Sequence, residues 1–228
     1  KDEFETFMPS EQFPELFPDN RVNMLYQDSE GRIWVGSDVL CFFDPENDKF
    51  QISHFTVNGQ MNQLLPQEAT SIIEDDNNIF WLTNFYYGLF RIDMNTRSVK
   101  NYFGNFDNPY NVGNNSAWKI LKDTSDMFWM ATRQGLLNFS EKGLEAGKVK
   151  LYDENSNKLP VSYLRDLYLD KNQRLWIGCH STGLFIYDII NEKVDHYHYG
   201  KEKEDLSSNL IYDIYKSEDD IFWIGTQC

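Results

Sequence analysis

Short apolar segments centred on tryptophan recur along the chain. Within each segment the apolar residues are consecutive, as in Phe80–Leu82 and Leu175–Ile177, and polar, turn-forming residues flank the segment. A strand that is buried on both faces has this continuous pattern, whereas a strand with one wet face alternates apolar and polar residues. The pattern therefore predicts short inner strands covered on both sides. Their central residues are Trp34, Trp81, Trp129, Trp176 and Trp223.

These tryptophans are 47 or 48 residues apart, and a constant period of this size is typical of repeat architectures. Other positions repeat in register with them. A small residue stands two positions after each tryptophan, and a Gly-Leu step follows in three of the units. An aspartate stands six residues before each of the first four tryptophans, and Ser217 replaces it in the fifth unit. The aspartates are Asp28, Asp75, Asp123 and Asp170.

Each unit is predicted to form four antiparallel strands. In the second unit the first strand ends at Asp75, the second carries Trp81, the third is Gly88–Asp93 and the fourth is Val99–Tyr102. No segment has sustained helical periodicity, so almost no helix is expected. A parallel β-helix would need shorter rungs, and a helical solenoid would need amphipathic helices. The predicted fold class is all-β, a β-propeller of four-stranded antiparallel blades, which leaves only short, protected edges.

The register predicts one propeller region over residues 1–228. Blade units are expected at about residues 20–55, 68–102, 115–152 and 161–197, with a partial unit at 209–228 and the last strand of a preceding blade at 1–8. The longest loops entering a first strand are expected at residues 56–67 and 103–114. The chain opens on Lys1 and stops after a second strand, so we expect a partial array from a longer propeller.

Charge and cysteine content exclude several functions. The net charge of −15 disfavours nucleic acid and anionic membrane surfaces, which bind clustered lysine and arginine. No apolar run approaches the ~20 residues of a membrane-spanning helix, so no direct membrane contact is expected. Three cysteines without paired spacing predict neither a disulfide framework nor a zinc site. No cofactor is expected, since no phosphate-binding glycine motif is present.

The repeat unit resembles the two-component regulator propeller repeat. Four segments carry the resemblance, namely Asp170–Gly178, Gly183–Asp188, Asn209–Ile214 and Ile221–Thr226. It extends over nearly the whole chain in register. The departures are Thr83 and Ala131 where the repeat usually has glycine, Ser217 at the turn aspartate, and Ser140 where the third strand usually ends in aspartate. These departures affect single blades and leave the resemblance in place.

The resemblance implies an extracytoplasmic, ligand-sensing region of a hybrid two-component sensor of the Bacteroidetes type. Such a region lies on the periplasmic face of a protein anchored in the inner membrane, recognises a polysaccharide-derived oligosaccharide and signals to a histidine kinase. The implied partners are further propeller and signalling domains of the same chain and a second copy in a homodimer of the full-length protein. No catalytic residue is expected within residues 1–228. A propeller enzyme (lyase or glycosidase) and a protein-interaction scaffold remain the alternatives.

A variable, mostly polar position interrupts the first strand, five residues before the turn aspartate, and is expected to face the central channel. Loops between second and third strands emerge on the same face, where aromatic rings, amides and hydroxyls suit a sugar. Packing between blades is the alternative for each aromatic side chain. The candidates are Trp118, Arg165, Tyr212 and Asn23 from the strands and Tyr86, Arg133, His180 and Tyr110 from the loops, led by Trp118. Two histidines, His196 and His198, are too few for a metal site.

Overall fold

The structure is a computed structural model that describes residues 21–37, 40–44, 46, 49–52, 54–57, 60–64, 68–102, 116–145, 148–155, 159–202 and 205–227. The chain divides into two compact units, Lys1–Tyr102 and Phe103–Cys228. The expected strand at residues 1–8 and the candidate Tyr110 lie outside the described residues. Within the described ranges, no helix is long and apolar enough to cross a membrane.

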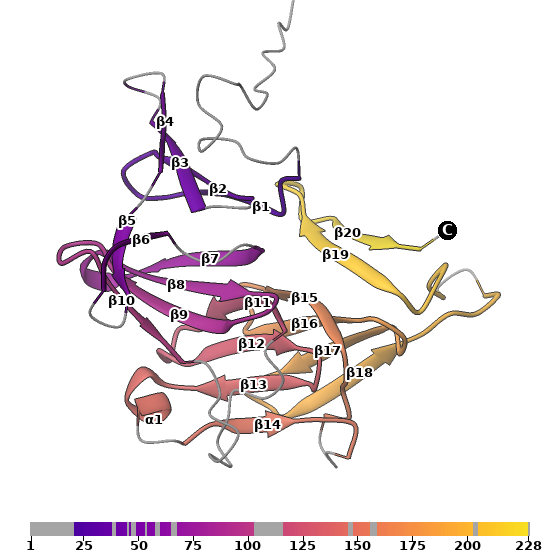
Figure 1. The fold of residues 1–228 in the computed structure, drawn as a ribbon. Coiled ribbons are helices and arrows are strands. Elements are labelled where there is room, and N and C mark those ends of the chain that lie inside the picture. Colours follow the sequence, from indigo (N-terminus) through magenta and orange to yellow (C-terminus); the bar gives the residue numbers. More distant parts are fainter. Residues whose placement is uncertain are drawn as a thin grey trace, which may run out of the picture. The chain divides into compact units, whose positions relative to one another are not determined.

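The first unit contains a four-stranded antiparallel sheet and a six-stranded sheet (Figure 1). The four-stranded sheet has the order β1 (Met24–Gln27), β2 (Ile33–Gly36), β3 (Leu40–Asp44) and β4 (Lys49–Ile52). The second sheet has the order β6-β5-β10-β9-β8-β7. Its strands are β5 (His54–Val57), β6 (Gln60–Leu64), β7 (Ala69–Asp75), β8 (Ile79–Asn84), β9 (Gly88–Asp93) and β10 (Ser98–Asn101), and the 3-10 turn Asp76–Asn78 joins β7 to β8.

The hairpin β5–β6 replaces the loop that we expected over residues 56–67. Strand β5 pairs in parallel with β10, and the Thr56 N–H donates to the Arg97 carbonyl at 2.8 Å. The sequence prediction was wrong here because the outer strand of a blade has unpaired backbone groups that a neighbouring segment can use. Residues 54–57 are aromatic and β-branched, which favours a strand. Phe55 is also buried in the core of this unit, so the hairpin is anchored by packing.

The second unit contains two four-stranded antiparallel sheets and a two-stranded sheet, each in chain order (Figure 1). The first sheet has β11 (Ala117–Lys122), β12 (Phe128–Thr132), β13 (Leu136–Phe139) and β14 (Lys150–Tyr152). The next has β15 (Leu164–Leu169), β16 (Arg174–Cys179), β17 (Leu184–Asp188) and β18 (Lys193–Tyr197), and the last has β19 (Ile211–Lys216) and β20 (Phe222–Thr226). Within the described residues the one α-helix is α1 (Glu141–Glu145). The predicted all-β fold with four-stranded antiparallel blades and almost no helix is confirmed.

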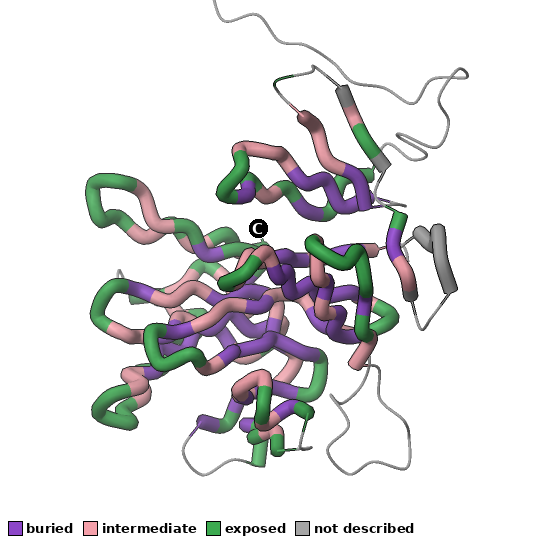
Figure 2. The backbone as a smooth tube through the Cα atoms, turned by 90° about the vertical axis from the view of Figure 1, so that its left-hand side faces the viewer, coloured by how far each residue is buried: buried purple, intermediate pink, exposed green. Residues whose placement is uncertain are grey.

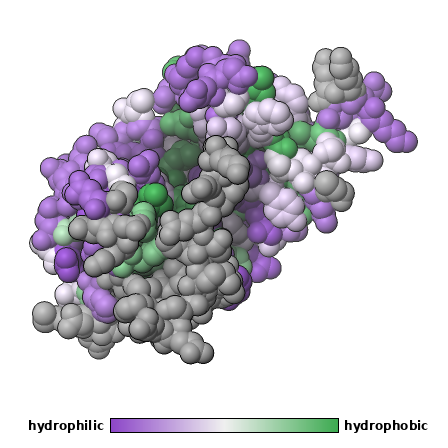
Figure 3. Space-filling view, turned by 90° about the horizontal axis from the view of Figure 1, so that it is seen from above, coloured by the Kyte–Doolittle hydropathy of each residue, from purple (hydrophilic) through white to green (hydrophobic). Residues whose placement is uncertain are grey.

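The inner strands of the second and third blades are buried on both faces, as their continuous apolar pattern predicts, whereas β20 of the partial last blade is half-buried to exposed. Every residue of β8 and every residue of β12 is buried. Figure 2 shows the contrast between purple inner strands and green hairpin turns. Outside the cores, purple hydrophilic residues cover much of the surface visible in Figure 3, with green hydrophobic residues in smaller areas.

A hydrogen bond between the turn aspartate and the blade tryptophan explains why the two residues repeat together. The carboxylate of Asp123 accepts from the backbone N–H groups of Ser125 and Met127 and from the indole Nε1–H of Trp129, at 2.8, 3.1 and 2.8 Å. The indole bond recurs at 2.7 Å in the first blade, 3.3 Å in the second and 3.2 Å in the fourth. The shorter Ser217 side chain instead donates to the Ile221 carbonyl, and Trp223 is 61% exposed.

Candidate functional site

The variable strand position is a β-bulge in four blades. Pairing between the first and second strands skips one residue in each of β7, β11, β15 and β19. A bulged residue is left out of the ladder, and its side chain is re-aimed. The alternation of side chains along a regular strand therefore does not predict the direction of the side chains at these positions. The skipped residues are Thr70, Trp118, Arg165 and Tyr212.

A backbone hydrogen bond recurs at the loop end of the blades. In each blade from the second to the fifth, the N–H four residues after the tryptophan donates to the carbonyl 13 residues before it, at 2.8 to 3.2 Å. The donor–acceptor pairs are Phe85–Glu68, Arg133–Ser116, His180–Tyr163 and Gln227–Leu210. The acceptor residue can also donate to the blade before it, since Tyr163 N–H bonds to the Arg133 carbonyl at 3.1 Å. This ladder fixes the backbone from which the loop side chains project.

Tyr163 has a left-handed backbone conformation, with φ of 48°. A bulky residue in this region is uncommon and is held there by its surroundings. The ladder supplies this support, because Tyr163 both donates to and accepts from neighbouring loop ends. Its ring is thereby placed between the third and fourth blades.

Four side chains surround the Tyr163 ring, and we name the five residues together the arginine–aromatic cluster. The Tyr163 and His180 rings stack with centroids 4.2 Å apart and an interplanar angle of 5°. The Trp118 ring lies 5.5 Å from the Tyr163 ring, centroid to centroid. The Arg165 guanidinium carbon lies 5.2 Å from the Trp118 ring centroid and 5.4 Å from that of Tyr163, while the Arg133 guanidinium carbon is 5.5 Å from Tyr163.

The cluster is partly open to solvent. Trp118, Tyr163, Arg165 and His180 are half-buried, and Arg133 is exposed. The Nε atom of Arg165 is itself buried and has no hydrogen-bond partner within the described part of the chain. The rings are thus ordered by contact with one another while part of their surface remains available to a ligand.

The cluster is electropositive although the whole protein is acidic. Partial burial and the nearby Arg165 charge lower the pKa of His180. The carboxylate next to Arg165 in sequence, Asp166, is turned to other groups: it receives the Ile214 N–H at 2.7 Å and pairs with the Lys119 ammonium at 3.4 Å. Burial raises the pKa of Asp166 in spite of these contacts.

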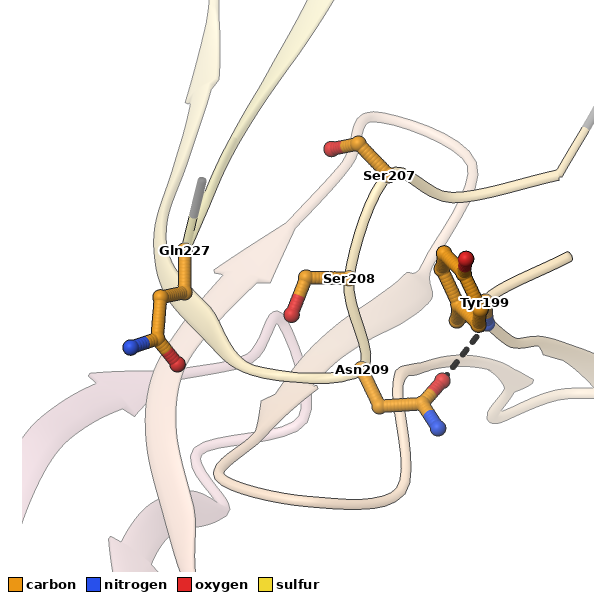
Figure 4. Close-up of a pocket in the computed structure, with 5 residues that line it drawn as sticks. All are labelled: Tyr199, Ser207, Ser208, Asn209 and Gln227. Carbon is orange, nitrogen blue, oxygen red and sulfur yellow. Dashed lines mark hydrogen bonds between the residues drawn. The ribbon is translucent and has the colours of Figure 1, made fainter.

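A polar pocket of about 340 Å³ lies at the loop end of the last blade (Figure 4). Figure 4 shows the Asn209 side chain turned toward Tyr199, and its Oδ1 accepts the Tyr199 N–H at 2.6 Å. The pocket adjoins the loop that carries His180, because the Gly183 N–H donates to the Asn209 carbonyl at 2.9 Å. It is lined by Tyr199, Ser207, Ser208, Asn209 and Gln227. The sequence prediction missed this pocket, since a short run of Ser and Asn before a strand also occurs in ordinary loops.

A second pocket, of about 230 Å³, lies among the hairpin turns of the fourth and fifth blades. Its charged groups are already paired. Lys171 lies 3.3 Å from the Asp220 carboxylate, and the Arg174 Nε–H donates to Asp170 at 2.7 Å. This pocket therefore fits a structural role in joining the two turns.

The structure brings four of the eight predicted candidates together: Trp118, Arg133, Arg165 and His180. The other described candidates do not join them. Tyr212 is 52% exposed on β19, and Asn23 and Tyr86 belong to the first unit, where Asn23 Nδ2 donates to the Glu68 carboxylate at 2.9 Å. Sequence reasoning missed Tyr163, the ring at the centre of the cluster. Aligning the residue 13 positions before each tryptophan would have found it as an aromatic in a variable position.

The histidine pair does not form a metal site in the structure. The His196 ring stacks on Phe185 at 3.9 Å and lies 5.7 Å from the His198 ring, between centroids. Within the described ranges, no group of three or more His, Cys, Asp or Glu residues is arranged to hold a metal ion.

Comparisons with known proteins match the repeat and the fold. The two component regulator propeller model matches residues 16–38 and 205–227, which confirms the resemblance found in the sequence. No curated protein matches the chain. The extracellular domain of a hybrid two component system of B. thetaiotaomicron is 19% identical with a TM-score of 0.60, over 97% of this chain and 34% of that one. The chain thus spans about a third of that structure's length.

Two further solved structures share the fold. PorZ, a surface component of the type-IX secretion system of Porphyromonas gingivalis, is 17% identical with a TM-score of 0.66, over 91% of this chain and 31% of that one. A structural genomics protein of unknown function from Bacteroides thetaiotaomicron is 11% identical with a TM-score of 0.57, over 88% of this chain and 55% of that one. At these identities the comparisons establish a shared propeller fold.

Proposed function

Because the chain carries two-component regulator propeller repeats, we propose that it is part of the extracytoplasmic, ligand-sensing region of a hybrid two-component sensor. Its ligand is an oligosaccharide released from a polysaccharide. The full-length protein is anchored in the inner membrane, presents this region to the periplasm and passes the signal to its own histidine kinase. The extracellular origin of the B. thetaiotaomicron structure supports this placement.

The arginine–aromatic cluster is the observation that carries the proposal. Sugars bind to proteins through C–H surfaces laid against aromatic rings and through hydroxyls paired with polar groups. Trp118, Tyr163 and His180 supply three half-buried rings from two adjacent blades. The adjoining polar pocket supplies hydroxyl and amide groups from the following blade. The two features together suit a ligand longer than a single sugar ring.

A ligand held by this cluster contacts more than one blade. Trp118 belongs to the third blade, while Tyr163 and His180 belong to the fourth. A ligand can shift a conformational equilibrium only by as much as its affinity differs between the two states. Side chains shared between blades provide such a difference, since their mutual distances depend on how the blades are packed. We propose that this is how occupancy reaches the rest of the sensor.

The cluster favours binding over catalysis. Glycoside hydrolysis needs two carboxyl groups on either side of the scissile bond. The arginine–aromatic cluster contains no carboxyl group, and the nearby Asp166 is occupied by Lys119 and the Ile214 N–H. A role as an oligosaccharide receptor therefore fits the geometry better than a role as a glycosidase.

The experiment is a calorimetric screen of the protein against a library of oligosaccharide fragments, with product analysis of each mixture. We expect binding without turnover. Release of a shorter product would contradict a pure sensing role, and absence of any binder would contradict the proposal itself. For a responsive oligosaccharide, Trp118→Ala should weaken binding, and Tyr215→Ala, which removes an exposed ring from β19, is the matched control. Equal effects of the two substitutions would exclude the cluster as the site.

A further inference from the structure

The two arginines of the cluster have no counter-charge among the described residues. Arg32 and Arg174 elsewhere in the protein place their Nε atoms 2.6 and 2.7 Å from the carboxylates of Asp28 and Asp170. Neither Arg133 nor Arg165 has an ion pair with any described residue, although the protein carries 36 acidic residues. The carboxylates of the described residues are therefore not used to neutralise this site.

Arg165 has a donor that is buried and unsatisfied. Its Nε is closed off from solvent and has no hydrogen-bond partner among the described residues. Leaving a buried donor unpaired costs about 1–3 kcal/mol, and more for a charged group. Meanwhile the guanidinium is held in place by the Trp118 and Tyr163 rings. Arg165 as a whole is half-buried, and its Nη atoms are not among the buried unpaired atoms, so the fixed guanidinium can reach a partner from outside the chain through these atoms.

The chemistry of that partner follows from the two kinds of group in the cluster. A guanidinium presents its N–H groups as a planar fork that matches a carboxylate in bidentate fashion. The adjacent rings match the C–H face of a sugar. An inorganic anion would pair with the guanidinium and leave the rings uncovered, whereas a neutral sugar would cover the rings and leave the guanidinium charge without a counter-charge.

We propose that the oligosaccharide recognised by this site is acidic, and that Arg165 and Arg133 receive the carboxylate of a uronic acid residue while its ring packs on Trp118 and Tyr163. This inference rests on the proposed function and adds the class of sugar. Partial burial is the larger cause of the lowered pKa of His180, and the Arg165 charge adds positive potential at the ring that stacks on Tyr163. A carboxylate bound beside Arg165 would offset that potential.

The test is a binding screen with oligosaccharides in matched pairs. Each pair consists of a uronate-containing fragment and the same fragment after reduction of its carboxyl groups to neutral hydroxymethyl groups, and sulfated fragments form a third arm. We expect the tightest ligand to be a uronate fragment, bound at least about tenfold more tightly than its reduced partner, since charge-assisted hydrogen bonds are the strong ones. A reduced or a sulfated fragment as the tightest ligand would overturn the inference while leaving the sensing proposal standing. Absence of binding by all fragments would overturn both.

Variants separate the charge of the site from its packing. Arg165→Gln should remove most of the preference for the uronate member of a pair, while Arg165→Lys should retain part of it, because lysine keeps the charge and loses the fork. Arg97→Gln, which removes an exposed arginine from a hairpin turn in the first unit, is the matched control. Thermal unfolding of each variant checks that the fold is intact. If Arg165→Gln weakened both members of a pair equally, its role would be packing, and the inference would be wrong.

Discussion

The junction between the loop ends of the first two blades resembles the junction between those of the third and fourth blades in its backbone hydrogen bonding. The two junctions differ in their side chains. In both places an N–H at the start of the later blade donates to a loop carbonyl of the earlier one, at 3.4 Å from Glu68 to Ser37 and at 3.1 Å from Tyr163 to Arg133. Glu68 and Tyr163 both have left-handed backbones, with φ of 68° and 48°. The repeat therefore reproduces even an unusual backbone conformation.

The side chains at these equivalent positions have different chemistry. In the first unit Asn23 donates to the Glu68 carboxylate, and in the second unit Trp118 contacts Tyr163 through its ring. Thr70 stands where the second unit has Arg165, and its hydroxyl bonds to Thr83 within the same blade. Folding needs the shared backbone, and so the variable side chains are free to serve recognition. Under the proposed function, we therefore expect ligand recognition to be concentrated in the second unit.

The largest expected effect is a loss of stability on removal of a turn aspartate, which both units use to hold a blade tryptophan. Asp123→Ala removes the acceptor for the buried indole of Trp129 and for two turn N–H groups. In the first unit Asp28→Ala removes the acceptor for the Trp34 indole and two turn N–H groups, and also the ion pair with Arg32. Because each buried orphaned donor costs about 1–3 kcal/mol, each substitution should lower the free energy of unfolding by about 2–4 kcal/mol. Urea denaturation measures this loss. A loss below about 0.5 kcal/mol in either unit would show that the aspartate does not hold the turn there.

The next largest effect is a loss of ligand affinity when the side-chain pair of the second unit is exchanged for that of the first. Replacing Trp118 by Asn together with Tyr163 by Glu gives the second unit the pair found in the first, on a backbone that accepts both pairs. The fold should be retained, and affinity for a responsive oligosaccharide should fall by about 30-fold or more, since two stacking rings are lost and each aromatic contact is worth about 0.5–1.5 kcal/mol beyond its buried area. Calorimetry measures the change. Unchanged affinity in a folded double variant would mean that recognition lies elsewhere.

A smaller effect concerns the titration of His180. Its folded pKa lies below the ordinary value of 6.5 because of partial burial and the Arg165 charge, so Arg165→Gln should raise it. A histidine with a lowered folded pKa favours the folded state above its unfolded pKa, and this contribution is lost as the pH falls through about 6.5 toward the folded value. An NMR titration of the ring resonances measures both pKa values. A His180 pKa that did not respond to Arg165→Gln would contradict an electrostatic influence of Arg165 on His180.

The smallest effect is expected in the first unit. Asn23→Ala removes an exposed hydrogen bond to Glu68 and should lower the free energy of unfolding by less than about 1 kcal/mol, because water replaces the lost partner. Urea denaturation again provides the measurement. A loss comparable to that of Asp28→Ala would mean that this pair is part of the framework rather than a variable feature of it.

Much of the fold could be predicted because its signal is local and repeated. The spacing of the tryptophans, the turn aspartates and the apolar segments defined the four-stranded blades. The hairpin β5–β6 could not be predicted, since its pairing with β10 depends on an edge about 40 residues away in the chain. We predicted a loop at residues 56–67 because the repeat unit has no strand in that segment.

The candidate site was predictable only in part, for a related reason. Trp118 and Arg165 stood out as departures from the repeat, and the structure shows that each is the extra residue of a β-bulge. Tyr163 did not stand out, because it precedes a strand in a position with no fixed pattern. Its importance arises from the contacts that it makes with residues from two blades.

The sequence by itself determined the repeat, the blade type and the positions that vary within it, because each blade is built from interactions between residues near in sequence, such as the bond from Trp129 to Asp123. Only the tertiary structure decided which variable positions meet. Trp118 and Arg165 are 47 residues apart in the chain and in contact in space, since equivalent positions of adjacent blades lie side by side. The placement of the Arg165 guanidinium against two rings, without an ion pair among the described residues, is likewise a property of that packing, and the proposed acidic sugar rests on it.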